Sequence, residues 1–350
     1  MNVPNRSLPT LREVAEAAGV SVGTASKVLS GSSDVSAHRA QSVREAAQRL
    51  GYRRNSLAAD LRRSRPKSIG FVLPDLTNAF FVDLARLLEN EALKNGYRLI
   101  LAHADEDPER ELERIRFVLS RQIAGMIVIP CRGFGQATNE IRAAGVPLVM
   151  ADRVDETFPE HTITIDSYRA AYEGTQHLLA LGHRRIAFLA NTLELVNSKA
   201  RADGYADAMR EADLSQEVDV VRCGMTAEEI HVTTLRALHR SRRPTALFAG
   251  GNVTTLGALR AMRDADLRIP EDLSLLSFDD APWMSVLRPC LTTIRQPVED
   301  IGHSIWQLMW ALINDEQRDT VHLKLKAELQ VRESTAPPAH SSAPPGSTVV

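Results

Sequence analysis

The sequence is poor in cysteine and in aromatic residues. Cys131, Cys223 and Cys290 are its three cysteines, and aromatic residues make up 5% of the chain. The cysteines lie far apart and form no Cys-x-x-Cys pair. We therefore expect unreactive buried thiols, and neither a disulfide framework nor a structural zinc site.

The sequence also lacks any long apolar run. None approaches the roughly 18 residues that a membrane-spanning helix requires. Residues 1–9 have no basic stretch followed by an apolar core and a small-residue cleavage site, which a secretory signal would show. We therefore expect a protein of the cytoplasm.

Motifs of catalysis are scarce as well. There is no Gly-x-x-x-x-Gly-Lys-Ser/Thr phosphate loop and no His-Glu-x-x-His, and the histidines do not gather at metal-ligand spacing. Gly133 and Gly135 form a loose Gly-x-Gly pattern that lacks the third glycine of a dinucleotide fingerprint. We expect no enzyme, no cofactor and no metal.

Charge is distributed unevenly along a chain of 350 residues, which is long enough for two or three folding units. Residues 1–67 hold 12 Lys and Arg against 5 Asp and Glu, a net +7, although the whole chain carries −2. A small basic module on an acidic body indicates that the module binds a polyanion.

Residue spacing predicts three short helices in the basic module. Thr10 and Glu13 have the spacing of a capping box, Gly19 follows the first helix in a turn, Ser21 can cap the second, and the third spans about residues 36–51. The side chains that we expect these helices to bury are Leu11, Val14, Ala15, Ala18, Ala25, Val28, Leu29, Val43, Ala46, Ala47 and Leu50. This order predicts a helix-turn-helix, which lays its second helix in the major groove of DNA.

Residues 10–30 read Thr-Leu-Arg-Glu-Val-Ala-Glu-Ala-Ala-Gly-Val-Ser-Val-Gly-Thr-Ala-Ser-Lys-Val-Leu-Ser, and Gly-Tyr-Arg-Arg-Asn follows at 51–55. This pattern resembles the lactose/galactose-repressor (LacI/GalR) family. The resemblance puts Val22, Gly23 and Lys27 at base-reading positions, although Lys27 stands where arginine is commoner. The alternatives are plain packing at the helix start for Val22, and a solvated lysine or one that contacts only phosphate for Lys27. The DNA-binding residues that the resemblance implies are Thr10, Ser21, Val22, Gly23, Thr24, Ser26, Lys27, Tyr52, Asn55, Ala58, Leu61 and Arg62.

Residues 55–67 contain helix formers and arginines, but the segment is too short to be a stable helix alone. The resemblance implies a hinge helix that orders when two copies pair over operator DNA, with Leu61 wedged between bases in the minor groove. A plain flexible linker is the alternative, and Arg54 stands where the family usually has proline.

From residue 68 onward, short apolar runs alternate with helix-like stretches. Such runs predict parallel strands covered on both faces, the doubly wound α/β arrangement. They form two series, so we expect a helical headpiece followed by a two-lobed α/β body. The expected parts are a headpiece at 1–54, a hinge at 55–67, a first lobe at 68–161 and 292–320, a second lobe at 162–291 and 321–335, and a disordered tail at 336–350.

Polar and aromatic residues follow several of these strands, where ligands bind in open parallel sheets. Aromatic faces, together with carboxylate, amide and guanidinium groups able to bind adjacent hydroxyls, suit a monosaccharide. The residues predicted to line this site are Asn78, Phe80, Phe81, Asp152, Arg153, Arg201, Asn252, Asp279 and Gln296. The alternatives are core packing for the phenylalanines, strand-end capping for the aspartates and a surface ion pair for Arg201. Asp166 is expected to cap a helix.

The body is similar to the ribose-type periplasmic binding proteins and to the effector domain of the same repressor family, so the resemblance covers about residues 10–330. Leu195 and Asn197 occupy a loop that presents arginine and threonine to the base in purine-sensing relatives. Their presence argues against a purine ligand.

Together these features predict a homodimeric transcription repressor. Each headpiece would bind half of a near-palindromic double-stranded operator, and a monosaccharide or derivative between the lobes would change the hinge separation. The ligand's identity, its sign as inducer or corepressor, the operator sequence and assembly beyond a dimer stay open. The alternatives are a periplasmic-type sugar carrier and an α/β enzyme, neither of which uses a DNA-binding module.

Overall fold

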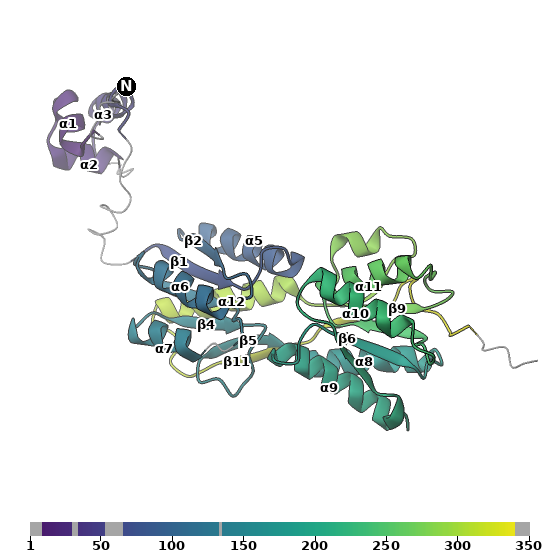
Figure 1. Cartoon of the computed structure of the whole chain (residues 1–350). Coiled ribbons are helices and arrows are strands. Elements are labelled where there is room, and N and C mark those ends of the chain that lie inside the picture. Colours follow the sequence, from purple (N-terminus) through teal and green to yellow (C-terminus); the bar gives the residue numbers. More distant parts are fainter. Residues whose placement is uncertain (1–8, 30–33, 53–65, 133–134, 340–350) are drawn as a thin grey trace, which may run out of the picture. The chain divides into compact units, whose positions relative to one another are not determined.

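The computed structural model describes residues 9–29, 34–52, 66–132 and 135–339 (Figure 1). The chain divides into two compact units between Pro66 and Lys67. Residues 55–65 of the predicted hinge, which include Asn55, Ala58, Leu61 and Arg62, lie outside the described residues.

The first unit contains α1 (Leu11–Ala17), α2 (Val22–Leu29) and α3 (Ala37–Leu50). The predicted capping box is confirmed, because the Thr10 hydroxyl accepts the Glu13 N–H at 3.3 Å and the Glu13 carboxylate accepts the Thr10 N–H at 2.6 Å. The Ser21 hydroxyl accepts the Thr24 N–H at 3.1 Å at the start of α2. These caps satisfy backbone donors that a helix start leaves without partners.

The three helices share one apolar core. The buried members are Val14, Ala15, Ala25, Val28, Ala40, Val43, Ala46 and Ala47. The prediction was wrong for Leu50, which is 38% exposed. Helix α3 ends at Leu50, and Gly51 after it takes a left-handed conformation with φ 66°. Tyr52, the next residue, donates its N–H to Ala47 O and packs on the core in place of Leu50.

The second unit contains two six-stranded sheets, which confirms the predicted pair of α/β lobes (Figure 1). In the first sheet all strands are parallel, in the order β11-β5-β4-β3-β1-β2. Its strands are β1 (Ser68–Leu73), β2 (Arg98–His103), β3 (Gly125–Val128), β4 (Leu148–Ala151), β5 (His161–Ile165) and β11 (His322–Leu325). Helices α5 (Ala79–Lys94) and α12 (Val298–Ile313) cover one face, and α6 (Pro108–Leu119) and α7 (Gly135–Ala143) cover the other.

The second sheet has the order β12-β10-β9-β8-β6-β7, and only its edge strand β12 is antiparallel. Its strands are β6 (Ile186–Ala190), β7 (Asp219–Arg222), β8 (Ala246–Ala249), β9 (Ser274–Phe278), β10 (Thr292–Arg295) and β12 (Glu328–Gln330). Helices α8 (Ser167–Ala180) and α9 (Val196–Glu211) cover one face, and α10 (Ala227–Leu238) and α11 (Asn252–Asp264) cover the other. Short 3-10 turns occur at Ser215–Glu217 and Pro282–Ser285.

The chain crosses between the lobes three times, each time one strand later than predicted. β5 and β11 were largely assigned to the second lobe but pair with each other in the first sheet, and β10 was assigned to the first lobe but pairs with β9 in the second. The physical reason is that each strand completes its hydrogen bonding in its own sheet before the chain crosses.

The predicted disordered tail begins too early. Ala336 donates its N–H to the Ser274 hydroxyl at 3.0 Å, and its carbonyl accepts from His183 Nε2 at 2.9 Å. The chain is therefore fixed to the second sheet through Ala336, and residues 340–350 lie outside the described part. Among the described helices, none is long and apolar enough to cross a lipid bilayer.

Candidate functional site

All nine residues predicted to line the ligand site lie around one cleft between the two sheets. The cavity within the cleft has a volume of about 90 Å³, which is smaller than the roughly 300–1,000 Å³ of drug-sized ligand sites. The strand-end rule thus brought together side chains that are far apart in the sequence. Their contact with a ligand stays a prediction.

The sequence-based prediction missed other residues of the cleft. Asp75, Glu106 and Asn191 also line it. They follow β1, β2 and β6, so the same strand-end rule finds them when it is applied to every strand. Leu195 and Asn197, which were considered only as evidence against a purine, line the cleft as well.

The first-lobe wall contains a buried arginine held by a carboxylate. The two terminal nitrogens of Arg153 donate to the two oxygens of Glu106 at 2.6 and 2.7 Å. Burial works against the charge of Arg153, but the hydrogen bonds and the charge of Glu106 outweigh it, so the pKa of Arg153 is raised. The guanidinium lies 5.4 Å from the ring centre of Phe81, on the inner side of α5.

Asp152 projects from the end of β4 with a left-handed φ of 61°. Its Oδ2 accepts from Asn197 Nδ2 at 3.1 Å, a hydrogen bond that joins the two lobes. Burial raises the pKa of Asp152, against the opposing charges of Arg201 and Arg153. Backbone in this sparsely populated region is found at functional sites, where the surrounding structure holds it.

Arg201 is the corresponding buried arginine of the second lobe, 6% exposed in the second turn of α9. It donates to the carbonyl of Gly250 at 2.8 Å, and its guanidinium carbon lies 3.6 Å from the ring centre of Phe278. Burial lowers the pKa of Arg201, and the negative charges of Asp279 and Asp152 oppose that shift. The alternative of a surface ion pair for Arg201 is wrong.

Asp279 lies at the end of β9, also with a left-handed φ, of 71°. Its carboxylate accepts from Gln296 Nε2 at 2.5 Å and from the Asn252 N–H at 3.3 Å. Asn252 in turn donates from Nδ2 to Asn78 Oδ1 at 2.9 Å, which is a second hydrogen bond between the lobes. Asn78 Oδ1 also accepts the Phe80 N–H at 3.1 Å and so caps α5.

Three buried oxygen atoms of the cleft have no hydrogen-bond partner among the described residues. They are Asp152 Oδ1, Asn252 Oδ1 and Gln296 Oε1. An unsatisfied buried acceptor costs about 1–3 kcal/mol. A ligand that donates hydrogen bonds to all three would remove that cost.

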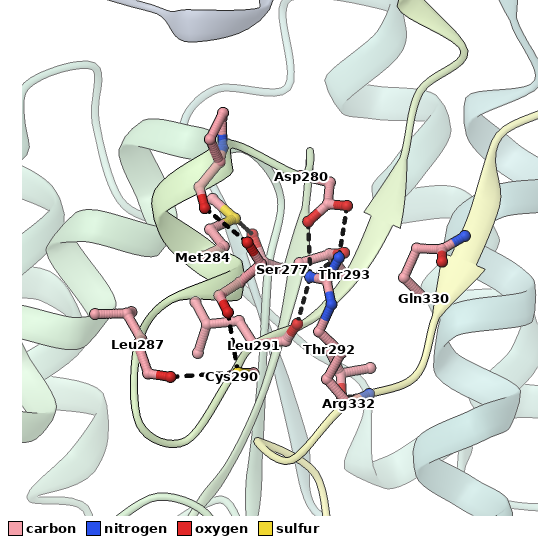
Figure 2. Close-up of polar contacts among 12 residues, drawn as sticks. Ser277, Asp280, Met284, Leu287, Cys290, Leu291, Thr292, Thr293, Gln330 and Arg332 are labelled. Carbon is pink, nitrogen blue, oxygen red and sulfur yellow. Dashed lines mark hydrogen bonds and ion pairs between the residues drawn. The ribbon is translucent and has the colours of Figure 1, made fainter.

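The residue after Asp279 is fixed by a clamp that the sequence does not reveal (Figure 2). Asp280 accepts from both terminal nitrogens of Arg332 at 2.7 Å each. Arg332 also donates to the Leu291 carbonyl at 2.8 Å and to the Thr293 hydroxyl at 3.2 Å, so it ties the C-terminal segment to β9 and β10. This network stiffens the backbone next to the cleft carboxylate of Asp279.

The other predictions for individual residues have mixed outcomes. Phe80 and Phe81 belong to the main apolar core as well as to the cleft wall, so the core-packing alternative holds for both. Asp166 caps α8 as expected, accepting the Arg169 N–H at 2.9 Å. Cys131 and Cys223 are buried free thiols, and burial raises the pKa of Cys223 to about 11, but Cys290 is only partly buried. In the described part of the chain, no group of His, Cys, Asp and Glu could hold a metal ion.

The α2 surface is the candidate nucleic-acid interface. Val22 is 42% exposed, which rules out plain packing, and Gly23 and Lys27 are exposed beside it. Thr10 and Ser21 are exposed too, whereas the side chains of Thr24, Ser26 and Tyr52 are partly buried. Gly19 to Gly23 has the Gly-x-Ser-x-Gly spacing of hydrolase nucleophiles, but the Ser21 hydroxyl caps α2 and bonds the Thr24 hydroxyl at 2.9 Å.

Comparison with family models and curated proteins gives the same two-part description. The model of the lacI family of bacterial regulatory proteins matches residues 10–55, and a periplasmic binding protein-like domain matches residues 175–335. Catabolite control protein A of Priestia megaterium is 31% identical over 93% of this chain and 99% of its own length. A ribose operon repressor of Halalkalibacterium halodurans is 30% identical over 94% and 97%.

Solved structures of related regulators are similar to this chain as well. The lac repressor dimer bound to operator and an anti-inducer has a TM-score of 0.82 and 27% identity, with 94% of this chain and 100% of that chain covered. The regulator CelR with cellobiose has a TM-score of 0.70 and 28% identity, covering 93% and 99%. A LacI family regulator from Enterococcus faecium with bound ribose has a TM-score of 0.71 and 27% identity, covering 77% and 99%.

Proposed function

Because this chain belongs to the lacI family of bacterial transcription regulators, we propose that it is a repressor whose affinity for operator DNA is set by a small carbohydrate in the cleft. The observation that carries the proposal is that one chain joins an exposed helix-turn-helix surface to a cleft with unpartnered buried oxygens. The first feature suits the major groove, and the second suits a ligand rich in hydroxyl groups.

The DNA contacts are proposed for the exposed side of α2 and its surroundings. Val22 offers an apolar contact to a thymine methyl, and Lys27 a donor to guanine O6 or N7. The close approach of α2 depends on Gly23, and Thr10, Ser21, Thr24, Ser26 and Tyr52 hold phosphates and the headpiece fold. Two copies read the halves of a near-palindromic operator, and the hinge residues Asn55, Ala58, Leu61 and Arg62 complete the contact at its centre.

The cleft controls this contact through the angle between the lobes. Hydrogen bonds from Asn252 to Asn78 and from Asn197 to Asp152 join the lobes at the place where the ligand binds. A ligand that binds one lobe arrangement more tightly shifts the population toward it, and only that difference in affinity changes DNA binding. The cleft binds its ligand without chemistry, and the protein acts in the cytoplasm, where the operator lies.

The proposal is tested by selecting binding sites for the full-length protein from random-sequence duplexes. The expected result is enrichment of a near-palindromic site that the protein binds with an affinity falling steeply as salt rises, because phosphate contacts release counterions. Lys27→Ala should weaken binding to that site about tenfold, equivalent to roughly 1.4 kcal/mol. Lys94→Ala, which changes an exposed lysine of α5 paired with Glu91, serves as the control and should bind as wild type. Recovery of unenriched sequence would disprove the proposed function.

A further inference from the structure

We infer that the ligand of the cleft is an uncharged polyhydroxy compound and that the cleft selects against phosphorylated and acidic sugars. The inference rests on the proposed function and specifies its ligand class. It follows from the charges that line the cleft and from the fact that the unpartnered hydrogen-bonding atoms of the cleft are acceptors.

The buried charges of the cleft already balance. Asp152 and Asp279 contribute two negative charges, and Arg153 and Arg201 contribute two positive charges. Each of these side chains is more than nine-tenths buried. Charges in such a setting interact strongly, so a ligand with a net negative charge would upset a set that is neutral without it.

The two arginines are also engaged by the protein itself. Arg153 directs both terminal nitrogens at Glu106, and Arg201 donates to the Gly250 carbonyl while its face lies on Phe278. A phosphate or carboxylate is bound in proteins chiefly by guanidinium donors arranged as a fork. An anionic ligand would have to displace Glu106 to reach such a fork here.

The remaining charged residues of the cleft are acidic. Asp75 and Glu106 line it together with the four buried groups, which gives the lining four carboxylates against two arginines. The Asp75 carboxylate is held by the Thr77 N–H and hydroxyl at 2.7 Å each. An anion that enters the cleft therefore meets a net negative lining.

The unpartnered atoms accept hydrogen bonds and cannot donate them. The Gln296 amide nitrogen faces the Asp279 carboxylate, which leaves Gln296 Oε1 without a partner. The Asn252 amide nitrogen faces Asn78 Oδ1, an atom that also accepts a backbone N–H, so Asn252 Oδ1 is left. With Asp152 Oδ1 these atoms require donors, which hydroxyl groups supply and ionised phosphate oxygens do not.

The test is the melting temperature of the full-length protein with matched compounds at equal concentrations. One set is ribose and ribose 5-phosphate; a second is glucose, glucose 6-phosphate and gluconate; a third is cellobiose and cellobionate. A bound ligand raises the melting temperature according to its affinity. We expect a neutral compound to give the largest shift, and its anionic counterparts to bind about tenfold more weakly or worse.

An anionic compound that binds more tightly than its neutral parent overturns the inference, and so does a panel in which no neutral compound raises the melting temperature. Asp75→Asn should reduce the difference in affinity between a neutral sugar and its phosphate, because it removes one negative charge from the lining. Asp203→Asn, which changes an exposed α9 aspartate paired with Lys199, is the matched control and should leave the preference unchanged. The two proposals can fail separately. If the cleft prefers a phosphate, the ligand class is wrong but the proposed function as a repressor stands. If no specific operator is found, the proposed function is wrong but the melting temperatures still report which compounds bind.

Discussion

Arg201→Leu is expected to lower the free energy of unfolding of the second unit by about 3–5 kcal/mol, the cost of breaking a buried ionic set by removing one partner. Arg201 is the buried cation whose charge acts on both Asp152 and Asp279. Its loss leaves those carboxylates in a desolvated cleft with one cation fewer. Urea unfolding followed by circular dichroism measures the change.

The matched control for this variant is Arg210→Leu on the same helix. Arg210 is exposed and pairs with Asp207 one turn earlier, so its loss should cost less than about 1 kcal/mol. The Arg201→Leu deficit should also shrink as the pH is lowered from neutrality. Burial already raises the pKa of Asp152, and loss of the arginine raises that pKa further. As the pH falls, Asp152 of the folded variant therefore takes up a proton before the unfolded chain does, and the neutral carboxyl no longer needs a cation, which restores part of the lost stability. Equal losses for the two variants would show that Arg201 is not the counter-charge of the cleft.

Gly204→Ala is expected to destabilise the second lobe by about 2–3 kcal/mol, because α8 and α9 approach each other too closely for a side chain there. A Cβ at Gly204 would overlap the backbone carbonyl oxygen of Tyr168 and lie 3.1 Å from the backbone nitrogen of Tyr172. Backbone atoms cannot move aside as the end of a flexible side chain can. The gain of about 1 kcal/mol in helix propensity does not offset this overlap.

Gly135→Ala is the control for Gly204→Ala. Gly135 begins α7, and a Cβ built there meets no atom within 4 Å. The midpoint of urea unfolding of this variant should equal that of the wild type or lie slightly above it. If Gly204→Ala behaves in the same way, the two helices have room to separate, and the position of Arg201 on α9 is not fixed by their close packing.

The sequence predicted the parts of the site that depend on topology. Asp152 and Asp279 were found because parallel strands end at a common edge, so their place in the sheet follows from recognising the strands. Glu106 was missed although it obeys the same rule, because its partner Arg153 lies 47 residues away and no local pattern connects them. Arg332 has no sequence signal at all, since its hydrogen bonds to Asp280 form only after the chain has crossed between the lobes for the third time.

The sequence-based predictions were wrong for the burial of Leu50 and for the start of the C-terminal tail, and each error has a physical cause. Leu50 fits the apolar periodicity of α3, but the helix ends there and Tyr52 takes its place on the core. Ala336 lies in a segment of low apolar content, yet it is held by hydrogen bonds to Ser274 and His183 that composition cannot show. Periodicity and composition thus describe what a residue favours, and tertiary contacts decide where it lies.

The cleft ligand is proposed to control operator affinity through Asp279. The most direct test of this proposal is fluorescence anisotropy of the selected operator, titrated with wild type and with Asp279→Asn, with and without the neutral sugar that raises the melting temperature most. The expected result is that the sugar changes the operator affinity of wild type at least about tenfold, equivalent to about 1.4 kcal/mol of coupling. Asp279→Asn should bind the operator as tightly as unliganded wild type and not respond to the sugar. A wild type that ignores the sugar, or a variant that responds as fully as wild type, would contradict the claim.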